Sequence, residues 1–259
     1  MTSTLASDPD LTCDDFLGGK VRLWQPARGY RAGVDPVMLA ASVDAAPGAQ
    51  VLDLGCGVGA AALCLLARVP DAEVTGLELQ GSYAALAQRN ADLNGASVSV
   101  VEGDLAQMPG DLRQRCFDHV MMNPPYYAPA TGTGSDDGGR DTALRGETPV
   151  ATWIDAATRR LAPKGVLTLI QRIERLPEIL AAIDDRLGSI IVAPITGREG
   201  RPASRFLLRA RKGGRSPYRL MAPIALHEGT RHERDAEDYC PRIANVLRNG
   251  AALFPFSAQ

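Results

Sequence analysis

The chain has 259 residues, of which 45% are hydrophobic and 22% charged, and its formal net charge at pH 7 is −2. This length and composition predict one large domain with at most a small appendage. Residues 1–10 lack the basic and apolar segments of a signal peptide, and no apolar run is long enough to span a bilayer. We therefore expect neither a secreted protein nor one that spans a membrane.

The cysteines and histidines follow no pattern typical of a metal site or of a disulfide framework. The three histidines do not cluster with carboxylates. The cysteines are odd in number and scattered: Cys13, Cys56, Cys64, Cys116 and Cys240. We expect no metal, no disulfides and a reducing, cytoplasmic location.

The first segment predicts a β-hairpin followed by a helix. Gly18 and Gly19 separate two short runs within residues 14–26, which is typical of a hairpin. Asp35 precedes Pro36, and we expect Asp35 to be the N-cap of a helix whose first residue is Pro36. We therefore divide the chain into residues 1–45, which hold these elements, and residues 46–259, the two parts forming effectively one structural domain.

Residues 51–59 predict a strand that runs into a glycine-rich turn, and residues 60–67 continue as a helix. The spacing is Asp53, Gly55, Gly57 and Gly59, which differs from the Gly-x-Gly-x-x-Gly pattern. In a doubly wound sheet, ligands lie beyond the carboxyl ends of the strands. An acid at that end suits a cationic ligand better than a pyrophosphate. An ordinary strand-to-helix turn and an NAD site remain alternatives.

Two further acids follow predicted strands along the chain. Glu78 ends the strand 73–77 and is placed to accept hydrogen bonds from both hydroxyls of a ribose. Asp104 follows the strand 98–101 and can accept from an adenine amino group. Together with Asp53, these acids predict a site for an adenosine-containing ligand.

The stretch Asn123-Pro124-Pro125-Tyr126 follows a predicted buried strand over 116–120. A proline pushes the residue before it into extended geometry, so Asn123 is held with its amide directed forward. We expect the Pro124 carbonyl to be free to accept a hydrogen bond, because a strand end offers no ladder partner. With the ring of Tyr126, these groups suit a planar substrate that bears an NH2 group. A plain Pro-Pro turn is the alternative.

The loop 128–146 is rich in Gly, Asp, Ser and Thr and carries Arg140 and Arg145. We interpret it as a lid over the substrate, with a solvated loop as the alternative. A helix over 150–161, a strand over 166–170, a helix over 176–187 and a strand over 189–194 are predicted to follow.

The most basic part of the chain surrounds the last long predicted strand, 203–210. Its cations favour contact with a phosphate backbone, and a solvated hairpin with exposed arginines is the alternative. The candidates for RNA contact here are Arg205, Arg209, Arg211, Lys212 and Arg215. A strand-like piece at 225–228 and a helix over 236–247 complete the prediction.

Read together, these motifs resemble the class I S-adenosylmethionine-dependent methyltransferases. The resemblance implies an α/β, Rossmann-like fold whose mostly parallel, seven-stranded sheet has helices on both faces, with the N-terminal β-hairpin added. It also implies that Asp53 and the glycine turn hold the methionine part of S-adenosylmethionine, Glu78 its ribose and Asp104 its adenine. The Asn-Pro-Pro-Tyr motif is similar to that of enzymes that methylate a planar amino or amide nitrogen, in which Asn123, Pro124 and Tyr126 would hold the target.

The order of the pieces resembles one family in particular, the bacterial tRNA1(Val) adenine N6-methyltransferases. This resemblance implies that Arg31, Gly33 and Asp35 line the cofactor pocket, and that the substrate is the adenine beside the anticodon of a tRNA. No separate RNA-binding domain is recognisable, so we expect the basic stretch and the lid to bind the RNA.

Other functions remain open at this point. The motifs also fit methylation of another RNA, at guanine N2 or adenine N6, or methylation of a glutamine side chain in a protein. A non-catalytic RNA-binding module is disfavoured because both sites look complete. An NAD dehydrogenase is weaker still, because no catalytic Tyr-x-x-x-Lys motif or histidine pair is present.

Overall fold

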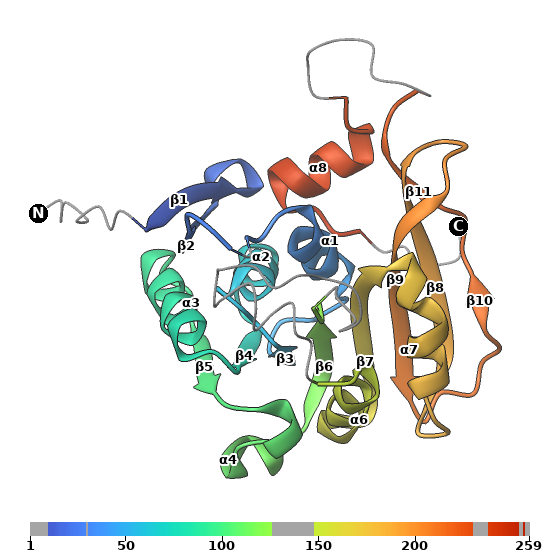
Figure 1. The fold of residues 1–259 in the computed structure, drawn as a ribbon, viewed down its shortest axis with the longest axis horizontal. Coiled ribbons are helices and arrows are strands. Elements are labelled where there is room, and N and C mark those ends of the chain that lie inside the picture. The colour runs from blue at the N-terminus through green and yellow to red at the C-terminus, as the bar shows by residue number, and fades with distance from the viewer. Residues whose placement is uncertain (1–9, 30, 126–147, 230–237, 254–255, 257–259) are drawn as a thin grey trace, which may run out of the picture.

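A computed structural model describes residues 10–29, 31–125, 148–229, 238–253 and 256. Seven long strands form its central sheet in the order β5-β4-β3-β6-β7-β9-β8 (Figure 1). All neighbours from β5 to β7 are parallel, whereas β9 is antiparallel to both β7 and β8. In chain order the strands are β3 (Gln50–Leu54), β4 (Glu73–Glu78), β5 (Val98–Glu102), β6 (Phe117–Met122), β7 (Leu161–Arg172), β8 (Leu187–Arg198) and β9 (Ala203–Lys212).

Two short strands extend the sheet beyond the seven that the sequence predicts. β10 (Arg219–Leu220) and β11 (Ile224–His227) both pair in parallel with β8, so the central sheet has nine strands among the described residues. The edge of β8 that faces away from β9 offers unpaired N–H and C=O groups, and these two pieces satisfy them. The strand-like piece predicted at 225–228 is β11.

The two faces of the sheet are covered by different helices. α1 (Val34–Ser42), α2 (Ala60–Arg68), α3 (Gly81–Leu93) and α8 (Pro241–Asn249) pack with one set of strand side chains. α4 (Gly110–Arg113), α6 (Val150–Arg160) and α7 (Leu176–Ala182) pack with the other. The split follows the two-residue period of a strand: Met121 of β6 faces the first set, and its neighbours Val120 and Met122 face the second.

The N-terminal hairpin consists of β1 (Leu11–Phe16), a short 3-10 turn η1 (Leu17–Gly19) and β2 (Val21–Pro26). Leu17 and Leu23 lie in the core shared with α1 and α2. Asn90 of α3 and Asn94, the C-cap residue of that helix, bind the backbone of β2 as a neighbouring strand would. Asn90 accepts from Trp24 N at 2.7 Å and donates to Trp24 O at 3.0 Å, and Asn94 does the same for Arg22 at 2.9 and 2.8 Å.

Several predicted element boundaries differ from the structure. The helix over 176–187 is shorter, because α7 ends at Ala182, whereas β7 and β8 are longer than predicted. α1 begins at Val34 with Gly33 as its N-cap, so the predicted capping role of Asp35 is wrong. Asp35 lies in the first turn, and its side chain binds Arg205 of β9 instead. Pro36 is tolerated there because the first turn has no intrahelical N–H partners to lose.

Between the remaining long elements lie two further 3-10 turns, η2 (Leu105–Gln107) and η3 (Ile173–Arg175). Within the described ranges, no helix is both long and apolar enough for a membrane span.

Candidate active site

The parallel strands bring the predicted acids and Asn123 to one edge of the sheet. Asp53 of β3 lies opposite Gly76 of β4 and Met121 of β6. The residues that follow these strands therefore meet at their carboxyl ends, where a doubly wound sheet binds ligands. Figure 1 shows these three neighbouring strands, β4, β3 and β6, which run in the same direction.

The glycine turn after β3 has a backbone that other residues adopt at a cost. Gly55, Gly57 and Gly59 have φ angles of 75°, 55° and 84°. A Cβ atom on Gly55 would lie 2.5 Å from the Trp153 ring of α6, whereas a Cβ on Gly57 would meet nothing within 4 Å. Gly55 therefore allows close packing of the turn on α6, and Gly57 lies beside open space that a ligand can approach.

Asp53 is the most unusual acid of this edge. Its side chain is 2% exposed, and its Oδ2 atom has no hydrogen-bond partner among the described residues. The pKa of Asp53 is raised to about 7: burial and, to a smaller extent, the nearby charge of Glu78 raise it, and a hydrogen bond from the Ala62 backbone partly opposes them. A buried acid without a cation partner is a good receptor for a positively charged ligand group, such as the ammonium of S-adenosylmethionine.

Glu78 is also buried, but its carboxylate is held by the backbone. Its Oε2 accepts from Gly57 N and its Oε1 from Gln80 N, each at 2.9 Å. Burial raises the pKa of Glu78, and these backbone hydrogen bonds lower it. The bond to Gly57 joins the acid to the glycine turn. Leu79 N is a third backbone donor to this carboxylate, so about one of its four acceptor positions remains for a ribose hydroxyl. The predicted contact with both hydroxyls stays a prediction.

The neighbouring residues fit a flat base beside this ribose site. Asp104 accepts from Ala106 N at 2.8 Å through Oδ1, which fixes its side chain at the start of η2. Gly103 N binds Glu78 O at 2.8 Å, so the two strand ends lie together. Leu79 is 53% exposed, which is unusual for a large apolar residue at a strand end. No motif in the sequence marks Leu79, and its exposed side chain gives this strand end an apolar surface.

The predicted acceptor motif lies directly after β6. Asn123 is half-buried and Pro124 is buried. The Pro124 carbonyl is not free, as the sequence predicted, because it accepts a hydrogen bond from Gln171 Nε2 at 2.9 Å. Gln171 comes from the neighbouring strand β7, and no local sequence pattern marks it. A carbonyl has two lone pairs, so one remains for a substrate N–H. Tyr126 lies outside the described residues.

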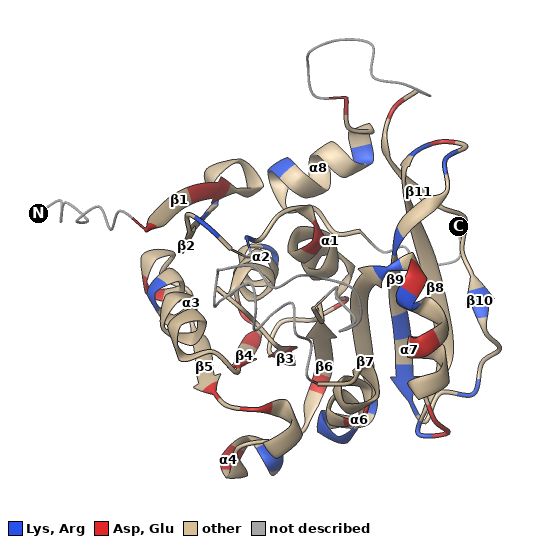
Figure 2. Cartoon of the chain, in the orientation of Figure 1, with Lys and Arg blue, Asp and Glu red and all other residues tan. Residues whose placement is uncertain are grey.

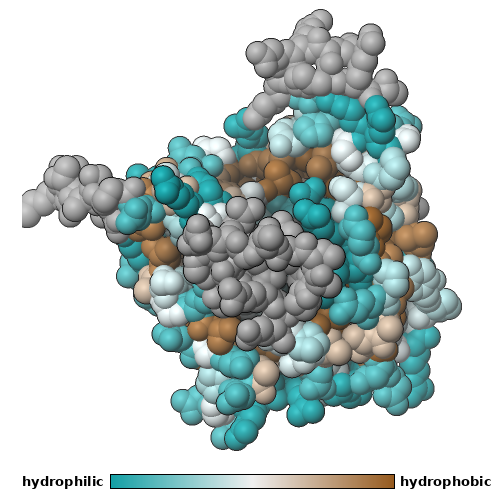
Figure 3. Space-filling model, viewed as in Figure 1, coloured by the Kyte–Doolittle hydropathy of each residue, from teal (hydrophilic) through white to brown (hydrophobic). Residues whose placement is uncertain are grey.

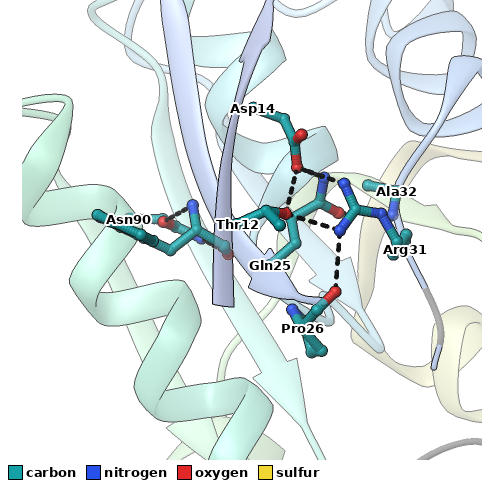
Figure 4. Close-up of polar contacts among 8 residues, drawn as sticks. Thr12, Asp14, Gln25, Pro26, Arg31, Ala32 and Asn90 are labelled. Carbon is teal, nitrogen blue, oxygen red and sulfur yellow. Dashed lines mark hydrogen bonds and ion pairs between the residues drawn. The ribbon is translucent and has the colours of Figure 1, made fainter. Parts of the chain in front are cut away.

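The pocket residues implied by resemblance make contacts within the protein. Arg31 binds Asp14 Oδ2 at 2.7 Å, Thr12 Oγ1 at 2.6 Å and the Pro26 carbonyl at 3.0 Å, as Figure 4 shows. Its guanidinium thus holds the hairpin to the segment that precedes α1. Gly33 is the N-cap of that helix, and Asp35 pairs with Arg205 at 2.9 Å. A direct role of Arg31, Gly33 and Asp35 in cofactor binding stays a prediction.

The predicted RNA-binding cations of residues 205–215 lie at both ends of strand β9. One end is at the carboxyl ends of the parallel strands, and the other is at their amino ends. Arg205 lies opposite Arg172, the last residue of β7, and is therefore at the same edge as Asn123. Arg211 donates to Lys164 O, and Lys212 donates to Leu161 O, both at the opposite edge.

Figure 2 shows these cations spread along β9 rather than gathered at one point. Arg209 lies between the two ends, opposite Thr168, and burial lowers its pKa. Arg215 is exposed beyond the end of β9. The lid residues Arg140 and Arg145 lie outside the described residues.

Arg172, which the sequence did not mark as a site residue, is a further cation at the same strand ends as Asn123. Arg172 is exposed there, and Figure 3 shows hydrophilic surface beside the central grey atoms toward β7 and β9, with hydrophobic patches beyond it. Among the residues that the structure describes, no group of three or more His, Cys, Asp or Glu side chains could hold a metal ion.

Comparison with known proteins gives the family context. Residues 34–187 match the family described as Methyltransferase small domain. The chain is 29% identical over 226 residues to the tRNA1(Val) (adenine(37)-N6)-methyltransferase of Yersinia pseudotuberculosis, covering 85% of this chain and 86% of that enzyme. It is 45% identical to the release factor glutamine methyltransferase of Geobacter sulfurreducens, but only over 82 residues, or 32% of this chain and 28% of that enzyme.

Solved structures support the same fold. A predicted O-methyltransferase, Atu636 from Agrobacterium tumefaciens, superposes with a TM-score of 0.69 at 30% identity, covering 85% of this chain and 98% of that chain. The 16S rRNA N2 G1207 methyltransferase of T. thermophilus, solved with AdoMet and guanosine, superposes with a TM-score of 0.54 at 21% identity. It covers 78% of this chain and 50% of that one, and the likeness shows the fold alone.

Proposed function

The chain belongs to the methyltransferase small domain family, and from this premise we propose that it methylates the N6 amino group of an adenine in RNA. The observation that carries the proposal is the position of Asn123 and Pro124 beside the buried acid Asp53. A receptor for a planar NH2 group and a receptor for a cation lie on adjacent strands, β6 and β3, at one edge of the sheet.

S-adenosylmethionine is the methyl donor, and when bound it supplies an electrophilic methyl group on a sulfonium. Asp53 binds the ammonium of its methionine part, which matches the orphaned Oδ2 atom. Glu78 binds the ribose through the acceptor position that the backbone leaves available. Asp104 and the exposed Leu79 bind the adenine.

The acceptor residues make a weak nucleophile reactive by orienting it. The lone pair of an adenine amino group is delocalised into the ring. Asn123 Oδ1 and the Pro124 carbonyl each accept one N–H, which directs the lone pair toward the methyl group. Tyr126 stacks on the base and keeps this geometry. Positioning and local electrostatics supply most of the rate effect, and the proton leaves to water afterward.

The substrate class follows from the relative that matches most of the chain. That enzyme is named for adenine 37 of tRNA1(Val), and the similarity covers 85% of this chain, including both halves of the site. We take the adenine beside the anticodon of a tRNA as the target. A base must be unpaired or flipped out to reach Asn123, and an anticodon loop offers unpaired bases.

The division of the basic stretch selects the RNA contacts near the target. Arg172 and Arg205 lie at the edge of Asn123 and are the first candidates for binding phosphates around the base, together with Arg140 and Arg145 of the lid. Arg211, Lys212 and Arg215 lie toward the other edge and can reach only distant parts of a large RNA. The cytoplasm, where tRNA is modified, is the location that fits this function.

Methylation of a protein glutamine is the second candidate. It is favoured by the local identity of 45% to a release factor glutamine methyltransferase. A side-chain amide presents the same planar NH2 group to Asn123 and Pro124. The match covers only 28% of that enzyme, however, so it bears on the shared chemistry more than on the substrate.

Transfer of a labelled methyl group from S-adenosylmethionine to three pools tests the proposal: total tRNA, ribosomal RNA and release factors. The tRNA comes from a strain that lacks the enzyme, so that its sites are unmodified. We expect label in tRNA that digests to N6-methyladenosine. Label in ribosomal RNA would keep the chemistry and replace the substrate. Label only in protein would overturn the RNA assignment in favour of a glutamine target.

A further inference from the structure

Gln171 lies next to the acceptor motif and has no part in the function described so far. It is the second-last residue of β7, the strand that pairs with β6 up to Met122. Its side chain is 0% exposed. A glutamine is rarely buried completely in a strand whose other interior positions are mostly apolar, because its amide needs hydrogen-bond partners.

Both ends of the Gln171 amide are used, and they connect two backbones. Its Nε2 donates to the Pro124 carbonyl at 2.9 Å, and its Oε1 accepts from Arg172 N at 2.8 Å. The second bond fixes the rotation of the amide, so that the NH2 group points at Pro124. The donor is therefore held in place by β7 and does not depend on a substrate for its orientation.

We propose that Gln171 is a positioning residue for methyl transfer, which holds the Pro124 carbonyl at the angle that accepts the substrate N–H. Pro124 follows the end of β6, where no ladder hydrogen bond holds its peptide group. Gln171 supplies the missing partner and occupies one lone pair. The other lone pair is then directed toward the target amine beside Asn123. This inference rests on the proposed function of that motif, but it holds for an adenine or a glutamine acceptor alike.

The test compares two substitutions on the acceptor pool that the wild type methylates. Gln171→Met keeps the length of the side chain and removes the donor. We expect kcat to fall about 10- to 100-fold, as for a misplaced reacting group, while the KM for the acceptor and the cofactor Kd stay within about twofold. A merely structural role would instead change kcat, KM and Kd together with Tm.

Gln171→Glu adds a pH signature. A protonated carboxyl can donate to the Pro124 carbonyl, but a carboxylate would repel it, and burial raises the pKa of such a carboxyl. The kcat of this variant relative to wild type should therefore rise as the pH falls from 8 to 6. Thr158→Val is the matched control, because Thr158 is 1% exposed and donates to a carbonyl, that of Ile154 at 2.6 Å, far from the motif in α6. It should lower Tm and leave kcat unchanged.

The outcomes separate the two proposals. A wild type that methylates none of the three pools refutes the proposed function and this inference with it. An active wild type with unchanged kcat in Gln171→Met, or with a flat pH ratio in Gln171→Glu, refutes the inference alone. Loss of kcat that tracks the loss of Tm in both Gln171→Met and Thr158→Val also refutes it.

Discussion

The two halves of the candidate site are built in different ways. In the cofactor half, Glu78 and Gly57 bind each other through a backbone amide, and both follow strands of the same local pattern. In the acceptor half, Gln171 reaches Pro124 across 47 residues, and Arg205 reaches Asp35 across 170. The first half thus joins the ends of strands that are consecutive in the chain, whereas the second joins elements that are distant in sequence. The difference teaches that the cofactor site can be recognised from motifs, whereas the acceptor site becomes complete only in the folded sheet.

We expect the largest effect on turnover from a substitution of Asn123, which belongs to the acceptor half of the site and not to the cofactor half. Asn123→Ala removes an acceptor that touches the target amine, so turnover should fall at least about 10²- to 10³-fold, as for other preorganised polar groups. The cofactor Kd should not change, because Asn123 lies outside the cofactor half. Labelled methyl transfer and calorimetry check the two parts. Unchanged turnover in this variant would refute the proposed mechanism. Asn249→Ala, at the end of α8, is the control.

Asp53 gives the corresponding test in the cofactor half. Its pKa is raised to about 7 by burial, so the folded chain holds a proton that the unfolded chain loses near pH 4. Without cofactor, stability should therefore fall as the pH rises from about 4 to 7. A bound ammonium favours the carboxylate, so cofactor affinity should rise over the same range, with release of a proton.

Calorimetry in buffers of different ionisation enthalpy measures that proton. Asp53→Asn should abolish its release near pH 6.5 and weaken cofactor binding about 10-fold or more, because one charge-assisted hydrogen bond is lost. Its stability without cofactor should no longer fall as the pH rises to 7. Proton release that persists in Asp53→Asn would assign the raised pKa to another group.

The glycine turn offers a smaller and purely structural contrast. Gly55→Ala would place a Cβ 2.5 Å from the Trp153 ring at a φ of 75°, whereas Gly57→Ala would add only backbone strain at a φ of 55°. We expect Gly57→Ala to cost about 1 to 2 kcal/mol of unfolding free energy and Gly55→Ala clearly more. Denaturant unfolding of both variants measures the difference. Equal losses would show that α6 yields to the added methyl group.

The smallest effects are expected for single arginines. Arg172→Ala should raise the KM for RNA a few-fold and reduce the salt dependence of binding by about one phosphate contact. Arg211→Ala removes a cation of the same strand, β9, at the opposite end from Arg205. It should change the KM for a short anticodon stem-loop little. Binding measured at several salt concentrations compares the two. A larger effect of Arg211 would place the RNA across the far edge.

The strands of the parallel part and the positions of the acids at their ends could be predicted because each depends on a short pattern. An apolar run followed by Asp53 and spaced glycines specifies a strand, a turn and an acid at a known edge. Likewise Glu78, Asp104 and Asn123 each follow an apolar run, and the parallel sheet brings such ends together. The predicted roles of Tyr126, Arg140 and Arg145 stay predictions, because these residues lie outside the part of the chain that the structure describes.

The remaining features could not be predicted because they depend on spatial neighbours that are distant in sequence. Gln171 looks like any polar residue at a strand end until β7 is paired with β6. Asp35 has the sequence of an N-cap, but the helix begins two residues earlier, at Val34, and the Asp35 side chain pairs with Arg205 of β9. The basic stretch looks compact in sequence, yet an extended strand at about 3.3 Å per residue puts the Cα atoms of Arg205 and Lys212 about 23 Å apart.

Asn90 links ligand exchange to a part of the molecule outside the catalytic cleft. Its amide binds Trp24 in the hairpin and also donates to the Val58 carbonyl of the glycine turn, at 2.9 Å. Its side chain is 0% exposed, so opening either partner alone leaves a buried polar group unsatisfied, at a cost of about 1 to 3 kcal/mol. The hairpin and the turn therefore loosen together. We therefore expect the residence time of the cofactor to depend partly on fluctuations of the hairpin formed by β1 and β2, and amide hydrogen exchange at Trp24 would report on them.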